Sequence, residues 1–142
     1  MPVTQATNLR ILYVDDDVDD CILLRESLAA SKAQADLVIA YDGESAIRYL
    51  NTLPESDTPS LIILDLNMPR WDGKKTLGYL KADPKLSHIP VVVMSTSENG
   101  LEKDTCRNMG AASYFVKPFH FDGYKDIISA FLSFIPGQEG QA

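Results

Sequence analysis

Side chains able to do chemistry stand at the ends of four apolar, strand-like runs in this sequence. Asp15 and Asp16 follow one run, and Asp65, Ser95 and Lys117 end the other three. In an open parallel sheet the carboxyl ends of the strands meet in one crevice, which is where such folds bind ligands. Three carboxylates, a hydroxyl and an ammonium gathered there can hold a divalent cation and a phosphoryl group.

The carboxylates predict a magnesium site. Two carboxylates side by side, such as Asp16 and Asp65, would raise the pKa of one of them unless a cation lay between them. Mg²⁺ prefers one or two carboxylates, several waters and a phosphate oxygen. The sharp turn after Asp65 offers backbone carbonyls as further ligands, and that of Asn67 is the best placed. Asp65 itself can accept a phosphoryl group as an acyl phosphate, while Lys117 and Ser95 cover the phosphoryl oxygens.

A purely structural interpretation stands beside this one. Asp17, Asp19 and Asp20 lie where a helix is expected to begin, and acids there cap amides and favour the helix dipole. Asp15 and Asp16 could be caps as well. A lysine before a proline is usually a surface residue at a turn. Each signal is weak alone, and it is their joint occurrence at four strand ends that favours a site.

The elements that must position these residues alternate along the chain. Continuously apolar runs predict buried strands at residues 9–14, 36–40, 61–64, 91–95 and 113–116. Apolar residues at helical spacing between them predict helices at 20–30, 43–50, 73–81, 99–109 and 122–134. Such alternation is typical of an α/β fold whose parallel sheet is covered on both faces.

Length and composition limit the function classes. A chain of 142 residues, 45% apolar and 23% charged, fits one globular domain. Its net charge of -7 argues against direct binding to nucleic acid or to an anionic membrane. No signal peptide or membrane-spanning run is visible. Cys21 and Cys106 are expected to be reduced and packed, which favours a cytoplasmic protein.

Four stretches together support a family resemblance. They are ILYVDDD at 11–17, LDLNMP at 64–69 with Asp-Gly at 72–73, VMST at 93–96 and YFVKPF at 114–119. With them, the chain resembles the receiver domain of two-component response regulators, the family of the chemotaxis protein CheY. The resemblance covers about residues 9–135, with flexible segments expected at 1–8 and 136–142, and indicates a stand-alone, single-domain type. It implies a doubly wound, flavodoxin-like five-stranded sheet of order 2-1-3-4-5 with five helices.

The resemblance also assigns roles around the acidic cluster. Asp65 would be the phosphoacceptor. Asp16 would ligate Mg²⁺ directly, with the Asn67 carbonyl as a further protein ligand and Asp15 acting through water. Lys117 would pair with the phosphoryl group.

The remaining roles concern the switch that follows phosphorylation. Ser95, with Thr96 beside it, would form the hydroxyl switch. Tyr114 would be the switch aromatic, whose ring moves inward when Ser95 is drawn toward the phosphate. Pro118 suggests a cis peptide bond.

The implied partner is a sensor histidine kinase, with a phytochrome-type kinase as the narrower expectation, or a histidine phosphotransfer protein. A downstream protein would read the altered surface. The last helical stretch carries surplus apolar residues, which either cap the core or mark a self-association face formed by the fourth helix, fifth strand and fifth helix. Those residues are Tyr124, Ile127, Ile128, Phe131, Leu132, Phe134 and Ile135.

Two other function classes remain open at this point. One is an Mg²⁺-dependent aspartyl-phosphate phosphatase or phosphotransferase, which typically carries a second acid two residues after the nucleophile. Asn67 occupies that position here, so we expect the protein to catalyse only its own phosphorylation and slow dephosphorylation. The other is a scaffold that binds partners without phosphorylation.

Overall fold

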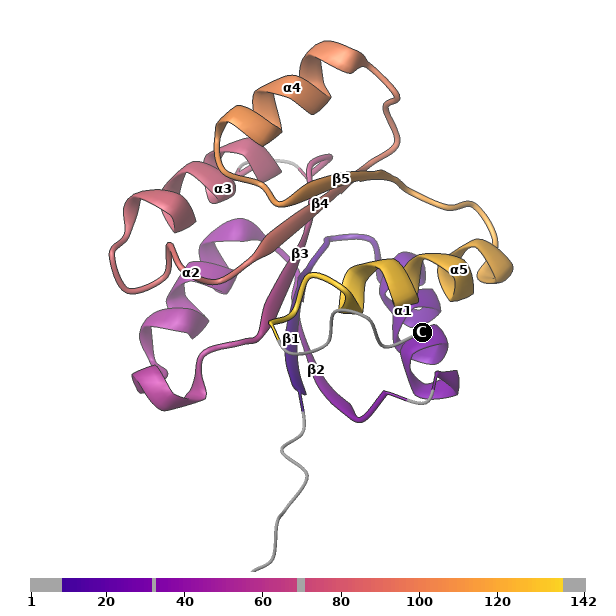
Figure 1. Ribbon diagram of the computed structural model, residues 1–142, viewed down its shortest axis with the longest axis horizontal. Coiled ribbons are helices and arrows are strands. Elements are labelled where there is room, and N and C mark those ends of the chain that lie inside the picture. The colour runs from indigo at the N-terminus through magenta and orange to yellow at the C-terminus, as the bar shows by residue number, and fades with distance from the viewer. Residues whose placement is uncertain (1–8, 32, 69–70, 137–142) are drawn as a thin grey trace, which may run out of the picture.

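A computed structural model describes residues 9–31, 33–68 and 71–136, and over these residues five parallel strands form one sheet (Figure 1). The strand order is β2-β1-β3-β4-β5, which confirms the predicted doubly wound, flavodoxin-like topology. The strands are β1 (Leu9–Val14), β2 (Ala35–Ala40), β3 (Leu61–Asp65), β4 (Val91–Ser95) and β5 (Ser113–Val116).

Five α-helices connect the strands. They are α1 (Val18–Ala30), α2 (Gly43–Asn51), α3 (Gly73–Ala82), α4 (Gly100–Asn108) and α5 (Phe121–Leu132). A short 3₁₀ helix, η1 (Glu55–Asp57), interrupts the polar loop before β3. Aspartates cap three of the helices, because the side chains of Asp17, Asp42 and Asp72 accept hydrogen bonds from backbone N–H groups in the first turns of α1, α2 and α3. The cap interpretation of Asp17 is therefore confirmed.

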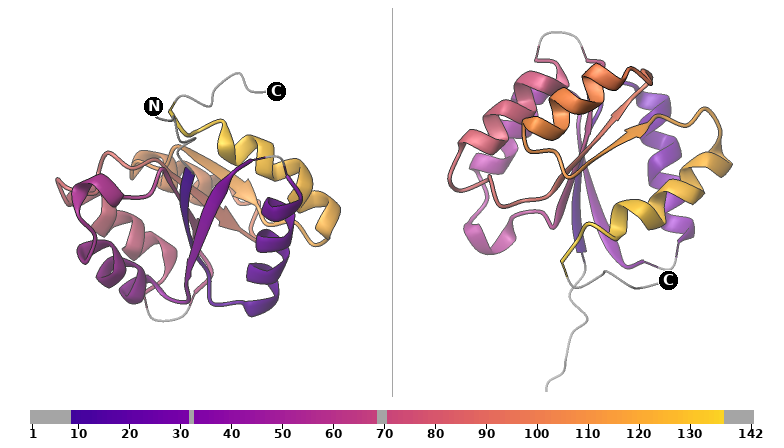
Figure 2. Two further views of the ribbon diagram at one scale, coloured as in Figure 1. Left: turned by 90° about the horizontal axis from the view of Figure 1, so that it is seen from below. Right: turned by 45° about the horizontal axis from the view of Figure 1, so that its top comes forward.

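The sheet separates two apolar cores. Alternate residues of the central strands point to opposite faces, so Leu12 and Leu64 belong to one core and Tyr13 and Ile63 to the other. Figure 2 shows α2, α3 and α4 on one face and α1 with α5 on the other. Every residue of β3 and β4 is buried, which explains their unbroken apolar runs.

Strand register aligns the carboxyl ends of the strands. Val14 pairs with Leu64, Asp65 with Met94, and Ser95 with Val116. The residue that follows each strand is therefore held close to the end of its neighbour.

Several simpler predictions can be compared with the described residues. Cys21 and Cys106 are buried free cysteines, as expected. None of the described helices has the length and apolar character needed to cross a membrane. The termini predicted to be flexible, 1–8 and 136–142, lie outside the described residues except for Pro136.

Candidate functional site

The strand ends bring a lysine and three acids together. The ammonium of Lys117, which follows β5, lies 2.9 Å from Asp15 Oδ2, 2.8 Å from Asp20 Oδ2 and 3.4 Å from Asp65 Oδ2. The Lys117 backbone N–H donates to the carbonyl of Ser95 at 2.7 Å, which holds the lysine beside the end of β4. The predicted meeting of Asp15, Asp65 and Lys117 in one crevice is therefore what the fold produces.

Lys117 supplies the positive charge of this cluster. Its side chain is only 8% exposed. Burial by itself lowers the pKa of Lys117, but hydrogen bonds to Asp20 and Asp15 and the charges of Asp15 and Asp65 raise that pKa by more, so the net shift is upward. The ammonium is thus charged at any physiological pH and compensates carboxylates that water reaches poorly.

Asp65 carries the most perturbed carboxyl group of the site. It is 1% exposed, and burial together with the nearby charge of Asp15 raises its pKa to about 7. Lys117 and the N–H of Asn67, which donates to Asp65 Oδ1 at 3.1 Å, act in the opposite direction. Because one lysine does not offset the burial of this carboxylate, additional positive charge beside it would favour its ionised form.

The acids are also spaced to hold a metal ion. Carboxylate oxygens of Asp15, Asp16 and Asp65 lie within 4.8 Å of one another. A donor set made only of oxygens suits a hard cation such as Mg²⁺ or Mn²⁺. Asp15 is held from two sides, because its Oδ2 accepts from the Tyr13 hydroxyl and its Oδ1 accepts from the N–H of Asp17 at 2.9 Å. The residues present therefore fit a divalent cation.

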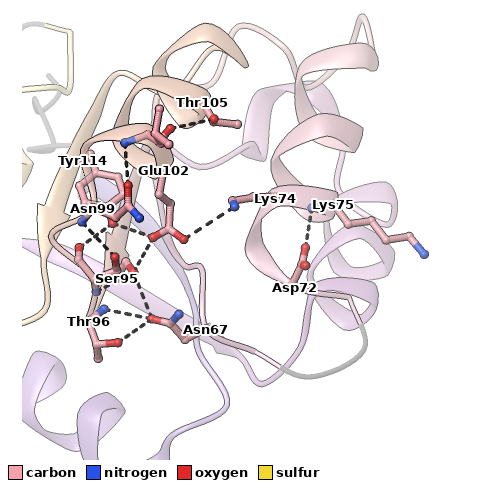
Figure 3. Close-up of polar contacts among 12 residues, drawn as sticks. Asn67, Asp72, Lys74, Lys75, Ser95, Thr96, Asn99, Glu102, Thr105 and Tyr114 are labelled. Carbon is pink, nitrogen blue, oxygen red and sulfur yellow. Dashed lines mark hydrogen bonds and ion pairs between the residues drawn. The ribbon is translucent and has the colours of Figure 1, made fainter.

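The predicted switch residues form a second polar group at the same edge of the sheet (Figure 3). Asn67 Oδ1 accepts from the Thr96 N–H at 3.0 Å and lies 3.3 Å from both the Ser95 and the Thr96 hydroxyl. The Tyr114 ring is buried, and its hydroxyl lies 2.7 Å from the carbonyl of Ser97. Ser95, Thr96 and Tyr114 thus lie next to one another and beside the turn after Asp65.

Two charged residues of this region were missed at the sequence level. Asp20 lies in the first turn of α1, as expected of a helix-start acid, but its carboxylate also pairs with Lys117. Glu102 was not singled out, yet its Oε1 lies 2.8 Å from the Ser95 hydroxyl and 2.7 Å from the Tyr114 hydroxyl. Both acids lie on helices, so the rule that located the other residues, a position at a strand end, gave no signal for them.

The prediction of a cis peptide bond before Pro118 is wrong for this structure. The described residues contain no cis peptide bond, and Lys117–Pro118 is trans. The trans form of such a bond is the more stable one by roughly 0.5–1 kcal/mol, and the ion pairs of Lys117 form with the bond in this state.

The apolar stripe of α5 mainly fills the core. Tyr124, Ile127, Ile128 and Phe131 are buried on the face of the sheet shared with α1. The large apolar side chains that remain exposed include Val18 and Ile22 of α1, Leu101 of α4, Val116 of β5 and Phe119. The core-capping interpretation therefore accounts for α5, and self-association stays a prediction.

Comparison with known proteins finds similarity to response regulators. The sequence profile of the response regulator receiver domain matches residues 11–129. Response regulator Rcp1 of Synechocystis sp. is 42% identical over 92 residues, an alignment that spans 63% of each chain. Protein PilG of Pseudomonas aeruginosa is 26% identical over 133 residues, which span 93% of this chain and 91% of PilG.

Solved structures agree. The crystal structure of the Mn²⁺-bound form of Rcp1 has a TM-score of 0.76 at 34% identity, over 85% of this chain and 92% of that one. The crystal structure of the phosphorylated cyanobacterial phytochrome response regulator RcpA has a TM-score of 0.82 at 32% identity, over 93% and 96% of the two chains.

Proposed function

Because this chain belongs to the response regulator receiver domain family, we propose that Asp65 accepts a phosphoryl group from a phosphohistidine on a partner protein. The observation that carries the proposal is the buried Asp65 carboxylate, held at the end of β3 with Lys117 at 3.4 Å and two further acids within metal-binding distance. These are the groups that phosphoryl transfer needs, because its catalysis is mostly positioning and charge neutralisation.

The transfer balances as a simple displacement. An Asp65 carboxylate oxygen forms a bond to phosphorus, the P–N bond of the phosphohistidine breaks, and the imidazole of the donor leaves with the electron pair and takes up a proton. We assign to Lys117, whose Nζ lies 3.4 Å from Asp65 Oδ2, the neutralisation of charge on the phosphoryl oxygens, and to the Ser95 hydroxyl a hydrogen bond to one of them. The negative surface of the acidic cluster would otherwise repel the incoming group.

We assign the metal site to Mg²⁺, with Asp16 and Asp65 as direct ligands, the Asn67 backbone carbonyl as a third and Asp15 through water. The spacing of the three carboxylates supports this assignment, as does the commitment of both Asp15 oxygens to Tyr13, Asp17 and Lys117. The related Rcp1 crystallised with Mn²⁺, a cation that also prefers oxygen ligands. When bound, the cation neutralises part of the phosphoryl charge.

The competing enzyme hypothesis is less well supported. A phosphatase of this kind would place an acid at position 67, but the residue is an asparagine whose side-chain oxygen accepts hydrogen bonds from Thr96. An amide in this position cannot act as general acid or base. The chain is therefore proposed to turn over only its own phosphoryl group.

The proposed donor is a sensor histidine kinase of the phytochrome type, or a histidine phosphotransfer protein, in the cytoplasm. RcpA, one of the similar proteins of known structure, is a phytochrome response regulator. Buried free cysteines fit a reducing compartment. The surface that a downstream protein or a second copy would read includes α4 and β5, where Leu101 is 78% exposed and Val116 41%.

Incubation with phosphoramidate, a small donor with a P–N bond, tests this function. In Mg²⁺ the wild-type protein should gain the mass of one phosphoryl group. Asp65→Asn should gain none, and chelation of the metal should abolish the reaction. Asp19→Asn is the matched control, because it removes an exposed acid from the same edge of the molecule and should react normally.

Three results would contradict the proposal. The absence of any gain in wild type would favour the scaffold hypothesis. A gain retained by Asp65→Asn would move the acceptor to another residue. Sustained hydrolysis of a phosphomonoester by the purified protein would favour the enzyme hypothesis.

A further inference from the structure

Glu102 connects the two switch residues to a helix on the surface. It lies in the first turn of α4, and its side chain is 20% exposed. Its Oε1 accepts hydrogen bonds from the Ser95 hydroxyl at 2.8 Å and the Tyr114 hydroxyl at 2.7 Å, while its Oε2 lies 3.7 Å from Lys74 Nζ on α3 (Figure 3). One carboxylate thus joins β4, β5 and α3 to α4.

The Ser95 hydroxyl has one proton to donate. Two acceptors lie within reach, Glu102 Oε1 at 2.8 Å and Asn67 Oδ1 at 3.3 Å. The shorter contact goes to a carboxylate, and hydrogen bonds to ionised acceptors are about twice as strong as those between neutral groups. Ser95 Oγ also accepts from the Ser97 N–H at 3.0 Å, which fixes its orientation. In this structure the Ser95 hydroxyl therefore donates its proton in a hydrogen bond to Glu102.

The ionised state of Glu102 is well supported by its neighbours. Burial raises the pKa of its carboxyl, but hydrogen bonds from Tyr114 and Ser95 and the charge of Lys74 lower that pKa by more, so the net shift is downward. At neutral pH Glu102 is a charged acceptor.

We propose that Glu102 is a positioning residue of the receiver switch, whose carboxylate competes with the phosphoryl group on Asp65 for the hydroxyl proton of Ser95. The inference rests on the proposed phosphorylation of Asp65. When the phosphoryl group accepts the hydrogen bond of the Ser95 hydroxyl, Glu102 loses its hydrogen bond to β4 and keeps its contacts with Tyr114 and Lys74. Because coupling between two sites is reciprocal, any partner that draws Glu102 away from Ser95 also strengthens the hold of Ser95 on the phosphoryl group.

Beryllofluoride, a phosphoryl analogue, provides the test, with its apparent affinity in Mg²⁺ measured by titration calorimetry. Glu102→Ala should bind it roughly tenfold more tightly than wild type, the effect expected for loss of one competing charged hydrogen bond. Glu102→Gln should show a smaller gain, because a neutral amide oxygen is a weaker competitor. Asp104→Asn removes an exposed acid from the same helix and should change the affinity by less than about twofold.

The same comparison in a Ser95→Ala background separates competition for the proton from general charge effects. Without the hydroxyl, Glu102→Ala should leave the affinity unchanged, which a double-mutant cycle reveals directly. Tighter binding that persists in this background would overturn the inference, and so would equal tightening by Asp104→Asn. If Glu102→Ala does not fold, Glu102→Gln decides by the same cycle.

The outcomes also distinguish this inference from the function on which it rests. Wild type that binds beryllofluoride with Mg²⁺ while neither Glu102 variant shifts the affinity would refute the role of Glu102 alone. Wild type that binds no beryllofluoride at all would refute the proposed phosphorylation site, and the inference with it.

Discussion

Replacing Asp65 by asparagine is expected to stabilise the folded protein when no divalent cation is present, although it removes the proposed phosphoacceptor. The cause is the burial of an ionised carboxylate that its neighbours compensate only in part. The pKa of Asp65 rises from 3.8 to about 7 on folding. At 1.36 kcal/mol per pKa unit this corresponds to roughly 4 kcal/mol lost from the free energy of unfolding above pH 7. An amide resembles the protonated carboxyl, and the pKa of about 7 already includes the ion pair with Lys117, so a net gain of up to about 4 kcal/mol is expected at pH 8.

The gain must depend on pH, and its sign follows from proton binding. Between pH 3.8 and about 7 the folded protein binds a proton at Asp65 that the unfolded chain has released. Wild-type stability therefore falls as pH rises through this window and is flat above it, whereas the asparagine variant lacks this dependence. The advantage of the variant at pH 8 should shrink by about 2 to 3 kcal/mol at pH 5.

Urea unfolding at pH 5 and pH 8 in the presence of a chelator measures this difference. Asp19→Asn, which also removes one carboxylate but an exposed one, should show no comparable pH-dependent gain. Added Mg²⁺ should stabilise wild type more than Asp65→Asn, because a ligand that binds only the folded state raises its stability. A variant less stable than wild type at pH 8, or a difference that is the same at both pH values, would refute the reasoning.

Three further substitutions test the compensation of buried polar groups. Lys117→Met leaves the carboxylates of Asp15 and Asp65 without their shared cation and should lower the free energy of unfolding by about 3–5 kcal/mol in the presence of a chelator. Urea unfolding with and without Mg²⁺ measures this loss and its partial recovery. A loss below about 1 kcal/mol would contradict the structure. Tyr124→Phe removes a fully buried hydroxyl that has no hydrogen-bond partner among the described residues, so the melting temperature should rise, by the equivalent of about 1 kcal/mol. Tyr114→Phe, which removes a bonded hydroxyl, should lower it.

The most reliable predictions from the sequence were the buried strands and the site residues at their carboxyl ends. β3 and β4 are buried at every position, so their apolar runs marked both the strands and the residues that end them. Parallel topology then placed Asp65 beside Lys117 without knowledge of any distance. The start of β2 was predicted one residue late, at Asp36 instead of Ala35, because this edge strand alternates between exposed and half-buried positions.

What the sequence did not predict depends on side-chain direction. Asp20 and Glu102 reach the site from α1 and α4, and the direction of a helical side chain follows from how the helix packs on the sheet. Asp20 serves as a first-turn acid and as an ion-pair partner together, so the structural and functional interpretations did not exclude each other. The isomer of the Lys117–Pro118 bond was also beyond reach, because cis and trans differ by only about 1 kcal/mol.

Because the sheet divides the apolar interior into two halves, the helices on its two faces offer separate surfaces to binding partners. Asp20 of α1 and Glu102 of α4 approach the same edge from opposite sides of the sheet. A protein bound over α1 and α5 leaves the outer surface of α4 open, so under the proposed function a phosphoryl donor docked there would not compete with a protein that reads α4.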